Sequence, residues 1–384
     1  MKAVVFHKPK YMRVESVPDP AIEDAEDIIL RVTSTAICGS DLHIFNGFLP
    51  QKDPIVMGHE FMGVVQETGP GVTQLQRGDR VVVPFPIACG QCFFCGHGLP
   101  GHCEISNNNY GPEGGLLKEK GGALFGYTDL YGGYSGGQAE YVRVPFANFG
   151  PRKISDRFTD EQVLFLTDIF PTGFCGVDWA GVKPGDTVAV FGCGPVGLMA
   201  QKCAWVRGAE RVIGLDIEPY RLEMARRTAK SEVLNVNETD CVEEIRMRTG
   251  GRGADVCIDA VGMEAERSLK DKLANIIHAE AGSIAVLRLA ISAVRRGGAI
   301  SLLGVYGMPY DNFPIGQIFD KGISLHTGQA TVQACIDELI TWLEEGRIVL
   351  DDIITHRLAL EEAPKGYELF NNKEDGCVKV VLNP

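Results

Sequence analysis

One short stretch of the chain carries a thiol, a hydroxyl, two imidazoles and two carboxylates, at Cys38, Ser40, Asp41, His43, His59 and Glu60. A catalytic zinc ion needs about three protein ligands and one open position for water or substrate. Cys38 and His59 are candidates for two of these ligands. Ser40 and His43 offer a path by which a proton could leave. The stretch therefore indicates metal-assisted redox or hydrolytic chemistry.

A second cluster consists of cysteines alone, with the spacing C-x2-C-x2-C-x7-C at Cys89, Cys92, Cys95 and Cys103. Four thiolates complete the tetrahedral shell of one zinc ion and leave no open position, so this site is predicted to be structural. An iron–sulfur cluster is the main alternative, but the last spacing and the lack of a following proline fit ferredoxin patterns poorly. Four free thiols in a turn are the remaining alternative, and the regular spacing argues against it.

A glycine-rich turn of the form G-x-G-x-x-G follows an apolar run and contains Gly192, Gly194, Pro195, Val196 and Gly197. In a strand–turn–helix unit the first glycine permits the tight turn and the second lets the backbone approach a pyrophosphate. The third allows the helix to pack closely on the strand. The helix N-terminus attracts the phosphates. The sequence therefore predicts a dinucleotide site, with a glycine turn that binds no ligand as the alternative.

Asp216 lies at the position that distinguishes NAD from NADP in dinucleotide sites of this kind. The next apolar run, 212–215, ends at Asp216. This carboxylate can accept hydrogen bonds from a ribose 2′-hydroxyl, and it would repel a 2′-phosphate. NAD is therefore predicted rather than NADP. The nearby Arg221 is also assigned to the cofactor site, and its charge weakens that preference.

Two patterns of apolar residues predict the strands and helices that position these side chains. Short alternating runs over the first 150 or so residues are typical of an antiparallel β domain. From about Thr172, strands alternate with helices, which predicts an α/β domain with a parallel, doubly wound sheet. The strand candidates are 187–191, 211–215, 256–259, 299–303 and 323–325.

Three further segments carry structural predictions. The tail from about Ala330, with a helix at 332–345 and a final strand-like run, is expected to return to the first domain. Residues 105–137, rich in Gly, Asn and Tyr, are predicted to form a surface loop. Residues 262–296 are predicted to contain a solvated helix. The seven cysteines outside the two clusters are expected to be small buried apolar residues.

Length and charge limit the class of protein. A chain of 384 residues favours two domains. A net charge of -13 argues against nucleic acid or an anionic membrane as a partner. The N-terminus lacks the apolar stretch of a signal peptide, and no run of about 20 apolar residues is present to span a bilayer. A cytoplasmic protein is therefore expected.

Taken together, these motifs resemble those of the zinc-dependent medium-chain alcohol dehydrogenases, over essentially the whole chain. The shared features are Cys38 with Ser40 and His43, the cysteine quartet, the glycine turn, and the run Gly58-His59-Glu60-x2-Gly63-x5-Gly69. Within that family, the stretches 166–173, 326–329 and 375–379 look most like the glutathione-independent formaldehyde dehydrogenase branch.

The resemblance implies an architecture of two domains. A GroES-like β-barrel catalytic domain would comprise residues 1–171 and 330–384. A Rossmann NAD-binding domain, with a doubly wound parallel sheet, would comprise residues 172–329. The active site would lie in the cleft between the two domains.

The resemblance also assigns a third ligand of the catalytic zinc, at Asp168, where many relatives carry a cysteine. A carboxylate is a harder ligand than a thiolate and would make the zinc a stronger Lewis acid. Capping of a helix that begins near Phe170 is the alternative role for Asp168. Glu60 matches a carboxylate that can enter the zinc shell, and Asp41 matches the acid that orients His59. The alternative for Asp41 is a solvent-facing turn residue.

A mechanism is implied by the same family. Zinc held by Cys38, His59 and Asp168 would lower the pKa of a bound alcohol, whose hydride passes to NAD. Ser40 would take the alcohol proton and hand it, through the cofactor ribose, to His43.

Three further residues are implied to contact the cofactor: Thr172 beside the nicotinamide, Thr327, and Lys379 at the pyrophosphate. A solvated lysine at a sheet edge is the alternative for Lys379. Each subunit would hold NAD and two zinc ions, one catalytic and one structural. Family analogy implies a homodimer or homotetramer.

The sequence therefore predicts a zinc-dependent oxidoreductase that transfers hydride between NAD and a small alcohol, or a hydrated aldehyde such as formaldehyde. A polyol or amino-alcohol dehydrogenase of the same family is the nearest alternative. A quinone reductase of the same fold is disfavoured because that branch lacks the zinc ligands. An NAD-binding structural or sensor protein is the alternative from a different class, and the intact set of candidate ligands argues against it.

Overall fold

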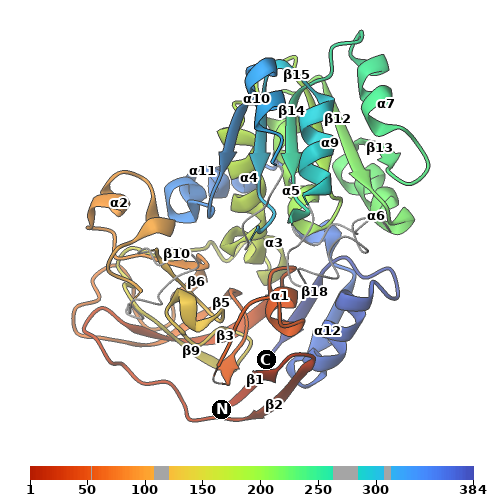
Figure 1. The fold of residues 1–384 in the computed structure, drawn as a ribbon. Coiled ribbons are helices and arrows are strands. Elements are labelled where there is room, and N and C mark those ends of the chain that lie inside the picture. Colours follow the sequence, from red (N-terminus) through yellow and green to blue (C-terminus); the bar gives the residue numbers. More distant parts are fainter. Residues whose placement is uncertain (53, 108–120, 263–283, 307–312) are drawn as a thin grey trace. The chain divides into compact units, whose positions relative to one another are not determined.

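The computed structural model describes residues 1–52, 54–107, 121–262, 284–306 and 313–384 (Figure 1). Backbone contacts divide the chain into two units, Met1–Pro171 with Ala330–Pro384, and Thr172–Gln329. Among the described residues, no helix has both the length and the apolar composition needed to cross a membrane.

The first unit is built on a largely antiparallel sheet. Its strand order is β10-β6-β5-β3-β18-β17, and β9 also pairs with β3. These strands span Arg152–Lys153, Arg80–Val83, Glu60–Thr68, Ile28–Ile37, Val380–Asn383, His356–Ala359 and, for β9, Tyr141–Val144. Only β17 and β18 are parallel to each other. The pairing of β18 with β3 confirms that the tail returns to the first part of the chain.

Two smaller sheets complete the β structure of this unit. One has the order β2-β1-β4, and the other pairs β7 with β8. Their bounds are Lys2–Lys8 for β1, Tyr11–Ser16 for β2, Ile55–Val56 for β4, Pro86–Ile87 for β7 and Ala123–Leu124 for β8. Side chains alternate along a strand, so every second residue of a strand lies on the same face of the sheet. One such face of β3, β5, β6 and β9 forms the core of this unit. Its buried residues include Ile28, Leu30, Val32, Val81, Val83, Val142 and Val144.

Helices of the first unit are mostly short. They are α1 (Asp41–Phe45), α2 (Phe93–Gly96), α3 (Asp160–Val163), α11 (Val332–Glu344) and α12 (Ala363–Asn372). Helix α4 (Ile169–Trp179) runs across the boundary between the two units. Single 3-10 turns lie at η1 (Pro100–His102), η2 (Asp129–Tyr131), η3 (Leu164–Thr167), η6 (Asp351–Ile353) and η7 (Leu360–Glu362).

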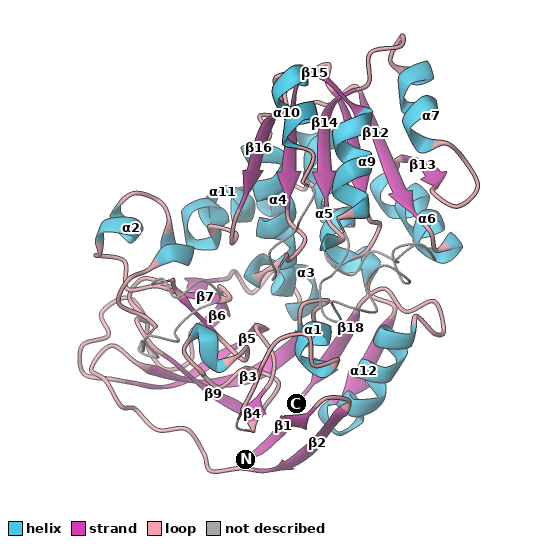
Figure 2. Ribbon diagram, viewed as in Figure 1, coloured by secondary structure: helices cyan, strands magenta, loops and turns pink. Residues whose placement is uncertain are grey.

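The second unit contains a parallel sheet with the order β13-β12-β11-β14-β15-β16. In that order the strands span Glu232–Asn235, Arg211–Asp216, Thr187–Phe191, Ala254–Asp259, Val294–Leu302 and Ser324–Thr327. Figure 2 shows helices on both sides of the sheet. They are α5 (Pro195–Val206), α6 (Pro219–Met224) with a π-helical continuation η4 (Ala225–Ala229), α7 (Cys241–Arg248), α9 (Ala285–Ala293) and α10 (Ile315–Lys321).

This sheet confirms the predicted parallel, doubly wound architecture. All five expected strands are present, and every residue of β11 is buried, as in strands covered on both faces. The remaining strand, β13, was not predicted. Its sequence, Glu-Val-Leu-Asn, is short and half polar, so it carries little strand signal.

Two predictions of solvent exposure, one for a loop and one for a helix, were wrong in the described residues. Within 105–137, residues 122–128 are buried, and Phe125 packs edge-to-face on Phe61 with ring centroids 5.1 Å apart. Residues 108–120 lie outside the described residues. Within 262–296, α9 is packed rather than solvated, because Leu287, Ala290 and Ile291 recur at helical spacing on one buried face. Residues 263–283 also lie outside the described residues.

Candidate metal centres and cofactor site

Four buried side chains converge in the first unit. The candidate ligand atoms of Cys38, His59, Glu60 and Asp168 all lie within 4.8 Å of one another. The Cys38 Sγ atom and the His59 Nε2 atom are each 3.2 Å from Asp168 Oδ2. Tetrahedral zinc with bonds of 2.0 to 2.3 Å holds its ligand atoms about 3.3 to 3.8 Å apart. A thiolate, an imidazole and a carboxylate at these separations fit one zinc ion.

Sheet register explains why residues so far apart in sequence meet here. Strands β3 and β5 are antiparallel neighbours, and Ala36 pairs with Glu60. Cys38 follows the end of β3 and His59 precedes β5, so both lie at the same end of the strand pair. Asp168 follows η3, and the Phe85 N–H donates to the carbonyl just before it, on Thr167, over 2.9 Å.

The Asp41 carboxylate supports His59 from behind. Asp41 is fully buried, which excludes the solvent-facing alternative. Its Oδ1 atom lies 3.0 Å from His59 Nδ1, and its Oδ2 atom accepts the Cys38 N–H over 3.0 Å. Burial by itself lowers the pKa of His59, but Asp41, Cys38 and Asp168 outweigh burial and raise it well above its usual value. A zinc ion would supply the positive charge that these groups favour, in place of the proton.

Glu60 and Lys379 form a buried ion pair beside the cluster. Lys379 is fully buried, and its Nζ donates to Glu60 Oε1 over 2.6 Å and to the Ile37 carbonyl over 3.0 Å. The interpretation of Lys379 as a solvated edge residue is therefore wrong. The predicted contact of Lys379 with the cofactor pyrophosphate stays a prediction.

Ser40 belongs to the same cluster. Its Oγ lies 3.1 Å from His59 Nε2, the nitrogen that also approaches Asp168 Oδ2. His43 is buried in α1, and its N–H donates to the Ser40 carbonyl over 3.1 Å. The structure thus places the hydroxyl at the candidate metal position, while transfer of a proton from Ser40 to His43 stays a prediction.

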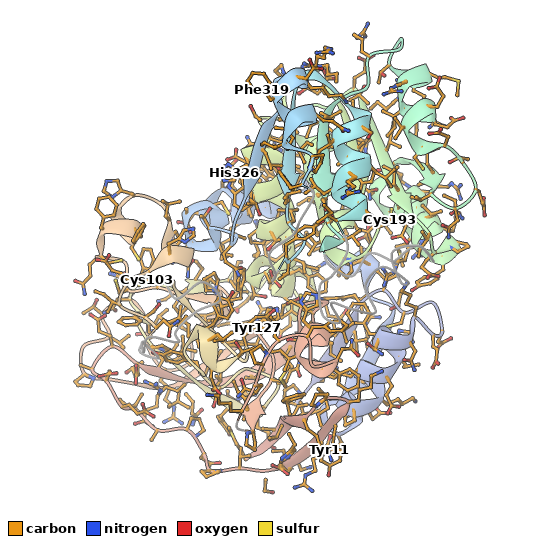
Figure 3. All side chains as sticks on the ribbon, viewed as in Figure 1. Tyr11, Cys103, Tyr127, Cys193, Phe319 and His326 are labelled. Carbon is orange, nitrogen blue, oxygen red and sulfur yellow. The ribbon has the colours of Figure 1, made fainter. Side chains whose placement is uncertain are left out.

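Aromatic rings enclose the His59 imidazole. The rings of Phe85 and Tyr127 both have centroids 6.0 Å from it, and Tyr127 stands edge-on at 88°. Burial raises the pKa of Tyr127 well above its usual value, so its phenol stays neutral. Tyr127 is labelled in Figure 3. Sequence reasoning missed it, because it lies in the segment that was predicted to be a surface loop.

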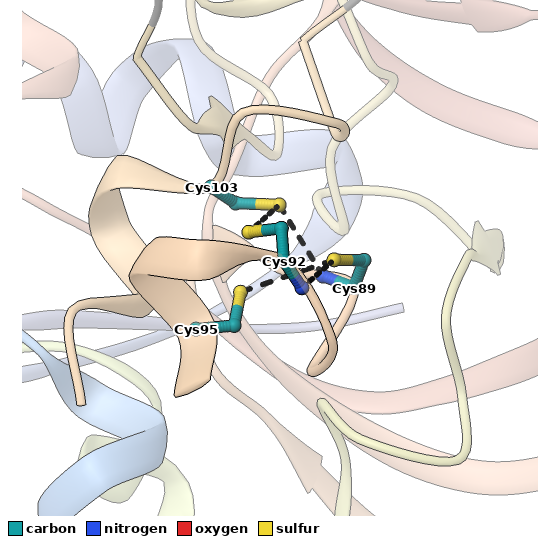
Figure 4. Close-up of side chains that lie close together, drawn as sticks. All are labelled: Cys89, Cys92, Cys95 and Cys103. Carbon is teal, nitrogen blue, oxygen red and sulfur yellow. Dashed lines mark hydrogen bonds between the residues drawn. The ribbon is translucent and has the colours of Figure 1, made fainter. Parts of the chain in front are cut away.

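The cysteine quartet forms the second candidate metal centre (Figure 4). The four thiols lie within 4.8 Å of one another, with 4.0 Å between the Sγ atoms of Cys89 and Cys95 and 3.9 Å between those of Cys92 and Cys103. Zinc–sulfur bonds of 2.3 Å in a tetrahedron give an edge of about 3.8 Å. No disulfide joins the four cysteines of this quartet, so a disulfide does not explain their close approach.

Backbone N–H groups prepare the quartet for thiolates. The Gln91 and Cys92 N–H groups donate to Cys89 Sγ over 3.5 and 3.4 Å, and the Cys89 N–H donates to Cys103 Sγ over 3.4 Å. Such bonds stabilise negative sulfur. Separations this short suit one ion rather than a larger iron–sulfur cluster, so the geometry favours a structural zinc site.

The glycine turn of the second unit connects β11 to α5. Gly192 has φ +96°, and a Cβ on Gly197 would lie 1.9 Å from the Gly192 carbonyl oxygen, so both positions need glycine. Gly194 differs, because its φ is -73° and an added Cβ would meet only Arg221 Nη1, at 3.8 Å. Neither backbone strain nor packing among the described residues requires glycine at 194. The space there is available to a cofactor that approaches the backbone closely.

Asp216 closes this turn at the end of β12. Its Oδ2 accepts the Cys193 N–H over 2.8 Å, and its Oδ1 accepts the Ile217 and Glu218 N–H groups over 2.7 and 2.9 Å. A carboxylate has about four acceptor positions, so one remains for a ribose hydroxyl. Cys193, between the first two glycines, is labelled in Figure 3.

We expect alanine substitutions at the two glycines to have different effects. Gly197→Ala should lower stability by about 2 kcal/mol or more because of the backbone clash, or about 4 to 8 °C in the unfolding midpoint. Gly194→Ala should leave the midpoint almost unchanged and weaken NADH binding. Thermal unfolding and fluorescence titration with NADH measure both. Tight NADH binding by Gly194→Ala would contradict the assignment of this space to the cofactor.

Two further predicted cofactor residues, Thr172 and Thr327, also lie in the second unit. Thr172 is half-buried in α4, and Thr327 ends the edge strand β16, where its hydroxyl donates to the Leu302 carbonyl over 3.4 Å. Because the strands are parallel, Thr327 lies at the carboxyl ends of the strands, as Gly192 and Asp216 do. The predicted cofactor contacts of both threonines stay predictions.

Comparison with known proteins bears on both units. The family model described as "Alcohol dehydrogenase GroES-like domain" matches residues 24–153, and the model described as "Zinc-binding dehydrogenase" matches residues 195–274. An uncharacterized zinc-type alcohol dehydrogenase-like protein of Bacillus subtilis is 47% identical over 100% of both chains. Glutathione-independent formaldehyde dehydrogenase of Pseudomonas aeruginosa is 34% identical over 96% of this chain and 94% of its own.

Solved structures show the same similarity. Alcohol dehydrogenase TADH from Thermus sp. ATN1 superposes with a TM-score of 0.86 at 36% identity, and the match covers 100% of this chain and 99% of that one. Together with the two family models, this match confirms the predicted fold class, a GroES-like domain combined with a Rossmann-like parallel sheet.

Proposed function

Because this chain belongs to the zinc-dependent alcohol dehydrogenase family, we propose that it is an NAD-dependent enzyme that oxidises small primary alcohols or hydrated aldehydes. The observation that carries the proposal is the convergence of Cys38, His59 and Asp168 on one buried point, with the Ser40 hydroxyl beside it. The 34% identity to a formaldehyde dehydrogenase supports hydrated formaldehyde as one candidate substrate.

Each side chain has a distinct task in this proposal. When bound, zinc supplies a Lewis acid that lowers the pKa of an alcohol, and NAD is the hydride acceptor. Cys38, His59 and Asp168 hold the ion, and Asp41 orients His59. Ser40 accepts the proton of the alcohol and passes it toward His43. Phe85 and Tyr127 exclude water from the face of His59.

The test is NAD reduction by the zinc-loaded protein against a panel of formaldehyde without glutathione, short primary and secondary alcohols, an aromatic alcohol and a polyol. Turnover of formaldehyde would support the hydrated aldehyde as the substrate. Turnover of primary alcohols alone would support the alcohol half of the proposal and exclude formaldehyde. Preference for the polyol would replace the proposed substrate class. No turnover of any substrate, with both zinc ions bound, would contradict the proposed activity.

The choice of NAD over NADP is carried by Asp216. We expect kcat/KM for NAD to exceed that for NADP, and Asp216→Asn to narrow the ratio by about tenfold or more, because repulsion of the 2′-phosphate is removed. Initial rates with both cofactors measure this ratio. Glu223→Gln, an exposed change on the nearby helix α6, is the matched control and should leave it unchanged. A wild-type preference for NADP would contradict the assignment.

We further propose a homodimer or homotetramer in the cytoplasm, by analogy with the family. Light scattering coupled to size-exclusion chromatography determines the subunit number. A monomer at micromolar concentration would contradict the proposed assembly.

A further inference from the structure

A line of fully buried polar side chains leads from the C-terminal helix α12 to the candidate zinc ligand His59. The Tyr367 hydroxyl donates to Gln138 Oε1 over 2.8 Å. Gln138 Nε2 donates to the Ala36 carbonyl over 3.1 Å and to Asp41 Oδ2 over 3.4 Å. Asp41 Oδ1 in turn lies 3.0 Å from His59 Nδ1. Tyr367, Gln138 and Asp41 each have 0% of their surface exposed.

These partners permit only one orientation of the Gln138 amide. Its nitrogen faces two acceptors, the Ala36 carbonyl and the Asp41 carboxylate, and its oxygen faces the Tyr367 hydroxyl. A flipped amide would direct its oxygen at both acceptors and lose two hydrogen bonds. Burial raises the pKa of Tyr367 well above its usual value, so the hydroxyl keeps its proton and remains a donor. The Ala36 carbonyl and the Asp41 carboxylate set the direction in which Gln138 donates, and the Tyr367 hydroxyl supports it by donating to the amide oxygen.

Gln138 also determines the path of the backbone that leads into His59. The Gln138 N–H donates to the Met57 carbonyl over 2.9 Å, and the Gly137 N–H donates to the Gly58 carbonyl over 2.8 Å. A Cβ on Gly58, whose φ is +100°, would lie 2.4 Å from Gln138 Cγ. Gln138 therefore contacts the segment before His59 as well as the carboxylate behind the imidazole.

The Asp41 carboxylate needs these donors because it is buried. A buried charge that loses a hydrogen-bond donor is destabilised, so the side chain moves toward another partner. The Gln138 amide and the Cys38 N–H both donate to Asp41 Oδ2, and Tyr367 also interacts with the Asp41 carboxylate. A carboxylate that shifts would no longer hold the imidazole toward the candidate metal position. Partners of this kind typically change metal affinity by 10- to 100-fold.

We propose that Gln138 and Tyr367 are positioning residues of the catalytic metal centre, which hold Asp41 so that it directs His59 at the ion. The inference rests on the proposed function, since it requires zinc at Cys38, His59 and Asp168. It gives the C-terminal segment a part in metal binding, although Tyr367 lies 229 residues from Gln138 in sequence.

The test compares the zinc affinity of the purified full-length protein with that of two variants. Gln138→Met keeps the side-chain length and removes both polar atoms, and Tyr367→Phe removes one hydroxyl. In equilibrium competition with a chelator, we expect Gln138→Met to weaken binding of the zinc ion at Cys38, His59 and Asp168 by about tenfold or more. Tyr367→Phe should shift the same ion in the same direction by a smaller factor. The second ion, held by the cysteine quartet, should be unaffected in both variants.

Two further measurements distinguish a positioning role from a merely structural one. Cobalt(II) in place of the weakened zinc ion should show a shifted visible spectrum in both variants, and excess zinc should restore occupancy. Tyr134→Phe is the matched control, because its hydroxyl donates to the Ser106 carbonyl over 3.0 Å and, among the described residues, shows no hydrogen bond to Tyr367, Gln138 or Asp41. It should leave both zinc affinities unchanged.

Two results would have different meanings. If both variants hold two zinc ions with wild-type affinity and an unchanged cobalt spectrum, Gln138 and Tyr367 have no positioning role. If the wild-type protein binds zinc only at the cysteine quartet, the proposed function itself fails. A loss of folding in Gln138→Met leaves Tyr367→Phe, the smaller change, to decide the question.

Discussion

Asp168→Ala is expected to lower the zinc content from about two ions per chain to about one, and to reduce kcat/KM by about a thousandfold. Asp168 Oδ2 is the atom that both the Cys38 sulfur and the His59 nitrogen approach, at 3.2 Å. Without it, only Cys38 and His59 remain of the three ligands that we assign to the ion. The loss of Lewis-acid stabilisation, several kcal/mol of the barrier, corresponds to such a reduction in rate.

Asp168→Cys is the matched control for this prediction. A thiolate keeps the single negative charge and can bind zinc, so two ions per chain and part of the activity should remain. Metal analysis of the purified proteins and initial-rate kinetics measure both variants. If Asp168→Ala keeps two tightly bound zinc ions, the carboxylate is not a ligand, and the helix-capping alternative gains support.

Cys103→Ser should have the second large effect, on stability rather than on chemistry. The change removes one of four thiols that pack closely in a buried cluster with Phe94, Phe146 and Phe149. Structural zinc sites contribute directly to folding, and loss of a metal belongs to the class of changes that cost about 4 kcal/mol or more. We expect an unfolding midpoint lower by about 10 °C and one zinc ion fewer per chain. Calorimetry and metal analysis test this.

A buried cysteine outside the quartet provides the comparison. Cys335 in α11 contacts the Val332 carbonyl over 3.5 Å through its sulfur, and a serine hydroxyl can make the same contact. Cys335→Ser should therefore keep both zinc ions and unfold within a few degrees of the wild type. A Cys103→Ser protein that lost no zinc and unfolded at the wild-type temperature would show that the quartet holds no structural ion.

Burial and neighbouring charges shift the pKa values of the ionisable groups around the candidate catalytic site. Burial raises the pKa of Glu60, while Lys379 acts in the opposite direction through the ion pair at 2.6 Å. Burial also raises the pKa of the Cys38 thiol, to about 12, in the absence of metal. Zinc must therefore displace a proton from Cys38, and its binding should weaken as the pH falls.

Features that are local in sequence could be predicted before the structure was known. The glycine turn and the cysteine quartet each occupy one short segment, so residue spacing alone indicates which atoms meet. Strand and helix periodicity likewise reports local burial, and it predicted the parallel sheet of the second unit correctly. It was wrong for residues 122–128 and for α9, because loop-like composition and isolated charges say little about what covers a segment.

Only the tertiary structure placed the distant residues. Asp168 joins Cys38 across 130 residues because η3 packs against β5. Lys379 joins Glu60 across 319 residues because β18 and β5 both pair with β3. The resemblance to known dehydrogenases suggested Asp168, but no pattern in the sequence singled out Tyr127, Gln138 or Tyr367. The sequence by itself determined Cys38, His59 and the cysteine quartet as candidate ligands, and the class of fold. Which buried side chains support those ligands depends on long-range packing, which spacing along a chain does not encode.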